Sequence, residues 1–94
     1  MTYVLTLRRI DQADLSRAAP FMPEDEEVET CLQSIESELN SLASITEVKR
    51  EGAVFCLGSS PEFNLEQVRK ELKPILSGSV TEFVRFVSLE RSIP

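Results

Sequence analysis

Two short segments separated by a glycine, residues 45–50 and 53–57, constrain the fold of this chain most strongly. The first mixes polar and apolar residues and has β-branched side chains at Ile45, Thr46 and Val48. The second is an apolar run too short for a helix, which is typical of a central strand covered on at least one face. Gly52 can take the positive φ that closes a short loop between them. The stretch 45–58 is therefore predicted to be a β-hairpin.

A strand and a helix are predicted before this hairpin. Residues 2–10 alternate in polarity, and the face that carries Tyr3, Leu5 and Leu7 is expected to be buried. Residues 23–43 show the spacing of one apolar helical face, with Pro23 in the first turn. The residues on that face are Val28, Cys31, Leu32, Ile35, Leu39 and Leu42. In the connection between this strand and this helix, Asp11 is expected to cap a short helical turn that Pro20 ends.

A second helix and a last strand are predicted after the hairpin. Asn64 and Gln67 have the spacing of a capping box, and Pro74 marks the point where the helix ends or kinks. Residues 80–89 form the last strand in this interpretation. Apolar residues load both of its faces, so the strand is either bulged or partly covered on its outer face.

The predicted element order is β-α-β-β-α-β, in one domain that covers residues 1–94. Two such β-α-β units give an α+β sandwich, with a four-stranded antiparallel sheet and two helices on one face. This arrangement resembles the ferredoxin-like architecture in its element order. The resemblance carries no functional motif, so function has to be argued from particular residues.

Known functions of that architecture can be checked against the chain. An acylphosphatase-like site would need a glycine-rich loop around Arg17, and residues 11–22 contain no glycine. A metal carrier would show a Cys-x-x-Cys loop, which is absent. An RNA-recognition domain would carry aromatic and basic residues on the strand 53–57, where Phe55 stands without a positive charge. A small-molecule-sensing regulatory domain needs no catalytic signature and stays open.

Composition narrows the function classes further. The chain has no histidine, which removes the commonest general base and metal ligand, so we expect no enzyme, no cofactor and no metal site. Its two cysteines, Cys31 and Cys56, are expected to be buried free thiols in the cytoplasm. No apolar run reaches the roughly 20 residues that span a bilayer. A net charge of −6 argues against broad binding to nucleic acid or anionic lipid.

The start of the first predicted helix is the strongest candidate for partner binding. Five of its six residues 24–29 are acidic, and residues 21–48 contain no lysine or arginine. Carboxylates in a first helical turn interact favourably with the helix dipole, but five of them repel one another. A solvated face is one interpretation, and a docking surface for a basic protein is the other. The candidate residues are Glu24, Asp25, Glu26, Glu27 and Glu29.

Phe21 and Met22 precede this helix between two prolines. As an exposed pair they would make a contact point for a partner, because long loops in small domains are often functional. The favoured alternative is that Phe21 tucks under the following helix and closes the core.

The resulting hypothesis is a small interaction or regulatory module that docks a protein partner. A second surface for this purpose is the open sheet face, with Val4, Thr6, Arg8 and either Phe83 or Phe86, which is also a route to a homodimer. A sharper version is an inhibitor whose carboxylates imitate nucleic-acid phosphates. The alternatives are a small-molecule-sensing domain within an oligomer and a phosphate cradle at residues 58–61. A direct nucleic-acid contact would use the basic residues Arg8, Arg9, Lys49, Arg50 and Arg85.

Overall fold

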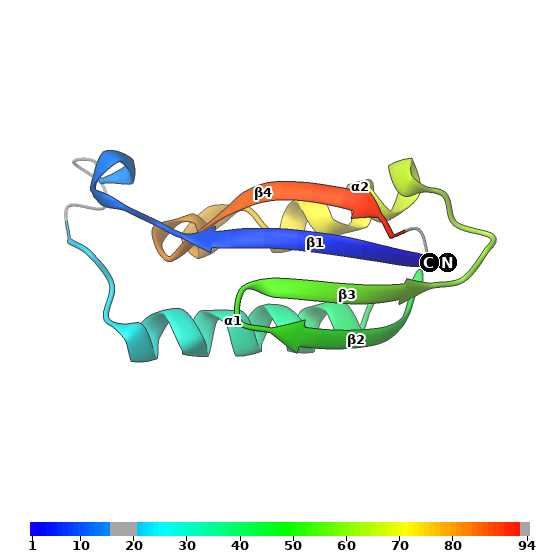
Figure 1. Cartoon of the computed structure of the whole chain (residues 1–94), viewed down its shortest axis with the longest axis horizontal. Coiled ribbons are helices and arrows are strands. Elements are labelled where there is room, and N and C mark those ends of the chain that lie inside the picture. The colour runs from blue at the N-terminus through cyan, green and yellow to red at the C-terminus, as the bar shows by residue number, and fades with distance from the viewer. Residues whose placement is uncertain (16–20, 93–94) are drawn as a thin grey trace.

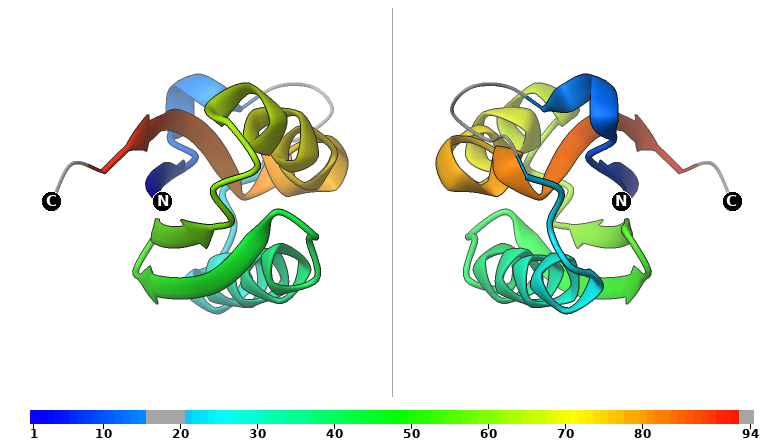
Figure 2. Two further views of the ribbon diagram at one scale, coloured as in Figure 1. Left: turned by 90° about the vertical axis from the view of Figure 1, so that its right-hand side faces the viewer. Right: turned by 90° about the vertical axis from the view of Figure 1, so that its left-hand side faces the viewer.

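The computed structural model describes residues 1–15 and 21–92, and its sheet has the predicted topology (Figure 1). The four strands are antiparallel and lie in the order β2-β3-β1-β4. Both helices cover one face of this sheet (Figure 2), so the predicted ferredoxin-like α+β sandwich is confirmed. The strands and helices are β1 (Thr2–Arg9), α1 (Asp25–Asn40), β2 (Ile45–Glu51), β3 (Val54–Ser59), α2 (Leu65–Ile75) and β4 (Val84–Arg91), with 3-10 turns η1 (Gln12–Asp14) and η2 (Gly78–Glu82).

The core lies between the sheet and the two helices. Tyr3, Leu5 and Leu7 of β1 are buried, as the alternation of this strand predicts. Phe55 and Leu57 of β3 point to the same face, since they pair with residues 5 and 3 of β1. Gly52 closes the hairpin at a φ of 60°, where a glycine is favoured over residues with a Cβ.

Helix α1 buries the predicted apolar stripe but differs from the prediction at its ends. Val28, Cys31, Leu32, Ile35 and Leu39 are buried. The N-cap is Glu24, so Pro23 precedes the helix instead of occupying its first turn. The helix ends at residue 40, short of the predicted 43, because the N–H of Ser41 bonds to the carbonyls of residues 38 and 39 and tightens the chain into a turn.

Helix α2 begins with the predicted capping box. The backbone N–H of Gln67 donates to Asn64 Oδ1 at 3.0 Å, and the N–H of Asn64 donates to Gln67 Oε1 at 2.8 Å. Pro74 lies in the last turn and the helix ends one residue later, as expected.

The last strand is shorter than predicted and is bulged. Residues 80–82 belong to η2, so the prediction of a strand from residue 80 is wrong; Gly78, at a φ of 72°, allows the preceding turn. In β4, residues 86 and 88 pair with the neighbouring residues 7 and 6 of β1, which leaves Val87 without a partner. This bulge explains why apolar residues load both faces, because it shifts the alternation by one residue.

Other predictions concern regions outside these elements. Asp11 caps η1 through a bond from the N–H of Ala13 to Asp11 Oδ1 at 2.9 Å, as expected. The turn ends at Asp14, because Leu15 is already extended, so the prediction that Pro20 ends it is wrong. Pro20 and Arg17 lie outside the described residues. No helix in the described ranges is long and apolar enough to cross a membrane.

Candidate functional site

The five predicted acidic residues of the α1 N-terminus form one exposed surface, here called the acidic row. The row consists of Glu24, Asp25, Glu26, Glu27 and Glu29, and all five residues are exposed. It starts at the N-cap and continues through the first turn of the helix. Carboxylates in this position interact favourably with the unpaired N–H groups of the helix start.

Two arginines from the sheet neutralise part of the acidic row. Arg9, at the end of β1, forms an ion pair with Asp25 and also donates to the carbonyl of Pro23. Arg50 of β2 forms an ion pair with Glu29, and its Nε lies 3.5 Å from Glu36. The hydrogen bond from Arg50 holds the pKa of Glu29 below its ordinary value. Sequence reasoning named both arginines as basic residues but missed these pairings, because each arginine is at least 16 residues from its carboxylate along the chain.

A third member of the row has a structural role. Glu27 accepts the backbone N–H of Glu24 at 2.9 Å and so completes a capping arrangement at the helix start. Glu24, the N-cap, forms the other half of this capping box with its own side chain. Glu24, Glu26 and Glu27 form no ion pair with a described cation. The negative charge that the row can offer to a partner is therefore concentrated on these three residues.

The favoured prediction that Phe21 closes the core is wrong. Its side chain is 83% exposed, and that of Met22 is 40% exposed. Pro23 is the buried residue of this segment, so the chain enters α1 with Phe21 directed outwards. Two apolar side chains thus stand in solvent immediately before the acidic row, as expected of a contact point.

A shallow groove of about 510 Å³ runs beside the acidic row. Glu26 and Glu27 form one wall, and Val80 and Phe83 of the η2 region contribute apolar surface opposite. Cys31 lies in the groove lining, and burial raises the pKa of its thiol, with a smaller contribution from Glu38. The thiol is therefore kept protonated and acts as part of the apolar lining.

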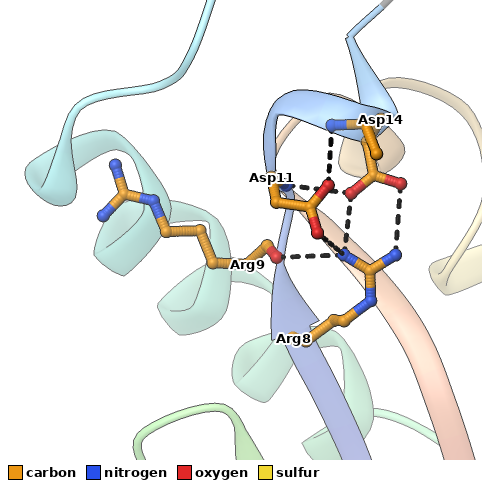
Figure 3. Close-up of polar contacts among 5 residues, drawn as sticks. Arg8, Arg9, Asp11 and Asp14 are labelled. Atoms are coloured by element: carbon orange, nitrogen blue, oxygen red, sulfur yellow. Dashed lines mark hydrogen bonds and ion pairs between the residues drawn. The ribbon is translucent and has the colours of Figure 1, made fainter.

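A separate charged cluster lies at the end of β1 (Figure 3). Arg8 binds Asp14 through two hydrogen bonds of 2.7 and 3.1 Å, and Asp14 also accepts the N–H of Asp11 at 2.9 Å. The bonds from Arg8 and then from Asp11 hold the pKa of Asp14 far below its usual range. Arg9 points away from this cluster. The cluster fixes η1 against β1, and its arginine is already occupied by a carboxylate.

Three of the other predicted basic residues are also engaged, whereas Arg85 forms no ion pair with a described carboxylate. Arg50 binds Glu29, Arg9 binds Asp25, and Lys49 lies 3.5 Å from Glu47. These pairings lower the positive charge available for direct nucleic-acid contact and leave that hypothesis weak.

The open sheet face is more polar than the sequence suggested. No described helix covers it, and Val4, Thr6 and Arg8 lie on it, as their alternation predicts. Phe86 does not, because it pairs with residue 7 and shares the helix-covered side, and Phe83 precedes the strand and packs against the core. Cys56 is exposed on the open face, so the prediction that both thiols are buried is wrong for this residue.

The serines proposed as a phosphate cradle have partners within the chain. Ser59 is buried and its hydroxyl donates to the carbonyl of Ser44 at 2.9 Å. Ser60 donates to Glu62 at 2.9 Å, which places a negative charge beside the loop. The arrangement does not favour an anion site. Among the residues described, no group of three or more cysteine or acidic side chains is placed to hold a metal ion.

A second groove lies between α2 and β4 and is here called the α2–β4 groove. Its volume is about 500 Å³. Leu72 and Leu89 form its floor together with Leu76 and Phe86, and the side chains of Arg69, Lys70 and Lys73 line its α2 side. No sequence pattern pointed to this groove, since it joins a helix face to a strand whose bulge sets the position of Phe86.

Comparison of the chain with protein-family models, curated proteins and solved structures finds no match.

Proposed function

We propose that this protein is a non-enzymatic interaction module that docks a basic protein partner through the acidic row and the Phe21–Met22 pair. One observation carries the proposal: Phe21, 83% exposed, directly precedes a helix start where Glu24 and Glu26 have no described cation partner. Large exposed apolar side chains beside unpaired charges are typical of contact surfaces. A cytoplasmic location belongs to the same proposal.

The surroundings of the acidic row support a protein partner that offers both apolar and positively charged groups. The groove beside Glu26 and Glu27 has apolar surface from Val80 and Phe83. A lysine or arginine can bury its aliphatic stem against such surface while its charged end reaches a carboxylate. Arg9 and Arg50 hold the neighbouring carboxylates in place, so the surface is organised before a partner arrives.

The open sheet face is the weaker of the two predicted docking surfaces. Its central part is made of Val4, Thr6, Val54 and Cys56, and charged side chains lie around them. A homodimer through this face would bury few large apolar side chains, whereas homodimer interfaces are usually more apolar than the general surface. The acidic row therefore takes precedence in the proposal.

Inhibition by imitation of nucleic acid is a narrower form of the same function. It would require several carboxylates free to take the place of phosphates, and two of the five in the row pair with arginines while two more take part in the capping box. Such an inhibitor would lose its target steeply as salt rises, because the target's phosphate sites are basic.

A small-molecule-sensing domain is the second candidate, and the α2–β4 groove favours it. At about 500 Å³ the groove has the size of ligand pockets, and its lining combines apolar residues with a few charges. A thermal-shift screen against amino acids and nucleotides checks this candidate. A ligand that raises the Tm would support sensing, because binding to the folded state alone stabilises it.

The main experiment compares affinity capture by three forms of the chain. The test variant is Glu24→Gln with Glu26→Gln, and the matched control is Glu51→Gln with Glu90→Gln, which removes two exposed carboxylates elsewhere. We expect a basic protein to be retained by the native chain and the control and lost from the test variant. Its retention should weaken as salt rises. Equal capture by all three forms would overturn the proposal.

A further inference from the structure

The α2–β4 groove owes its apolar floor to the bulge in β4. Because Val87 is skipped, Phe86 pairs with residue 7 and faces the helix-covered side of the sheet. No described helix lies over it there, so Phe86 remains 50% exposed beside Leu72 and Leu89. An aromatic ring that is half exposed at the edge of a core is apolar surface open to a partner.

The rim of this groove is basic and its charges are free. Arg69, Lys70 and Lys73 line it, and none of the three forms an ion pair with a described carboxylate. The arginines at positions 8, 9 and 50 are all paired. The lining contains one acidic residue, Glu66. In a chain of net charge −6, this combination of an apolar floor with unpaired cations stands out from the rest of the described surface.

The same chain carries a second surface whose charge is opposite to that of the groove. Phe21 and Met22 are exposed apolar side chains, and Glu24 and Glu26 follow them as carboxylates without a described cation partner. Both the apolar and the charged parts of this surface complement the groove. Figure 2 shows α1, which follows this segment, and α2, which lines the groove, beside each other on one face of the sheet.

We propose that the α2–β4 groove binds the Phe21–Glu26 segment of a second copy of this chain. The Phe21 ring would cover Phe86 and Leu72, and the carboxylates of Glu24 and Glu26 would face Lys70 and Lys73. The contact joins two different patches, so a reciprocal exchange closes a dimer and a one-way exchange extends to longer assemblies.

Pairing of two β4 edges is a less favourable use of the same region. A bulge leaves one residue out of register and twists the strand, which is one way in which natural edges resist pairing. Side-chain docking into the groove needs no continuous strand edge, so the irregular pairing at Val87 does not hinder it.

The proposal shares the acidic row with the proposed function, and the two therefore compete. A basic partner on the row would displace the second copy. Docking of a basic partner on the acidic row does not use the groove, so changes in the groove separate these two proposals experimentally.

The experiment measures molecular mass against protein concentration by light scattering at about 0.1 M salt, where the Debye length is about 10 Å and net repulsion between copies is screened. The native chain, 10.6 kDa as a monomer, should at least double in mass as concentration rises. K70E/K73E should remain monomeric. The control K49E reverses a charge on the open sheet face, away from the groove, and should associate like the native chain.

A charge exchange provides the decisive measurement. E24K/E26K alone should be monomeric, because its lysines meet a basic groove. Mixed with K70E/K73E it should form a complex, since each variant then complements the other. Circular dichroism and thermal unfolding check that each variant folds. A native chain that stays monomeric, or association that survives K70E/K73E, would overturn the inference.

Failure of this inference and failure of the proposed function give different results. K70E/K73E should still capture the basic partner, because its acidic row is unchanged. Glu24→Gln with Glu26→Gln should lose both the partner and self-association. A native monomer that still captures a partner would overturn the second-copy contact and leave the proposed function in place.

Discussion

At the scale of single residues, the arginines of β1 and β2 decide which carboxylates are free. Arg8 is bound to Asp14, Arg9 to Asp25 and Arg50 to Glu29. The first pairing is local, whereas the other two join a strand to a residue at least 16 positions away along the chain. The acidic row therefore carries less available charge than its composition suggests, and its carboxylates without a described cation partner are Glu24, Glu26 and Glu27.

The Arg8–Asp14 pair predicts how stability changes in acid. The pKa of Asp14 is lowered from 3.8 in the folded chain, so the unfolded chain binds more protons as the pH falls past that value. The contribution of the pair is fully present above about pH 5 and is lost as the pH falls through the folded pKa.

The test compares the native chain with Asp14→Asn by urea unfolding at several pH values. The variant should be less stable at pH 6, and the difference from the native chain should shrink steadily below pH 4. Asp11, which lies 3.9 Å from Arg8, provides the comparison, and Asp11→Asn should show a weaker pH dependence. A constant difference between native and Asp14→Asn across this range would contradict the assignment.

At the scale of elements, the bulge in β4 is the feature with the widest consequences. It places Val84 and Leu89 on the buried face although their numbers differ in parity. It also turns Phe86 towards the α2–β4 groove and leaves Val87 49% exposed. One inserted residue thus determines the lining of a candidate binding surface.

Deletion of Val87 should therefore be tolerated by the fold. Residues 86 and 88 already pair with neighbouring residues of β1, so the deletion joins two segments that are in register. The regular edge that results should pair more readily with other chains, and we expect a folded protein that aggregates more. The measurement is thermal unfolding with light scattering.

A deletion in β3 supplies the control for this prediction. Cys56 is exposed, like Val87, but its pairing with both neighbouring strands is regular. Its deletion reverses the faces of the residues on one side of it and should unfold the chain. Equal loss of structure in the two deletion variants would contradict the prediction that the fold tolerates removal of Val87.

At the scale of the whole molecule, charge is separated between the two helices. Helix α1 has six carboxylates and no lysine or arginine, whereas Arg69, Lys70 and Lys73 of α2 line the opposing groove. Such a distribution favours oriented association, because it steers unlike surfaces together.

This distribution predicts that the docking carboxylates contribute little to stability. Glu24→Gln with Glu26→Gln should change the free energy of unfolding by no more than about 0.5 kcal/mol, since both side chains are exposed and glutamine keeps the oxygen through which residue 24 caps the helix. Asp25→Asn with Glu29→Gln should lower stability more, because it removes both ion pairs to the sheet. Urea unfolding of the two variants checks the order, and a reversed order would contradict the division of the row into docking and structural carboxylates.

The sequence by itself determined the element order, the hairpin, the buried face of β1, the apolar stripe of α1 and the cap of α2. These depend on local periodicity and on contacts a few residues apart, which a pattern records. It also located the acidic row and the Phe21–Met22 pair. Only the tertiary structure decided that Phe21 is exposed, which carboxylates are paired, which face carries Cys56, and that a basic apolar groove exists. Each of these depends on residues that meet across the fold, and local spacing carries no information about such contacts.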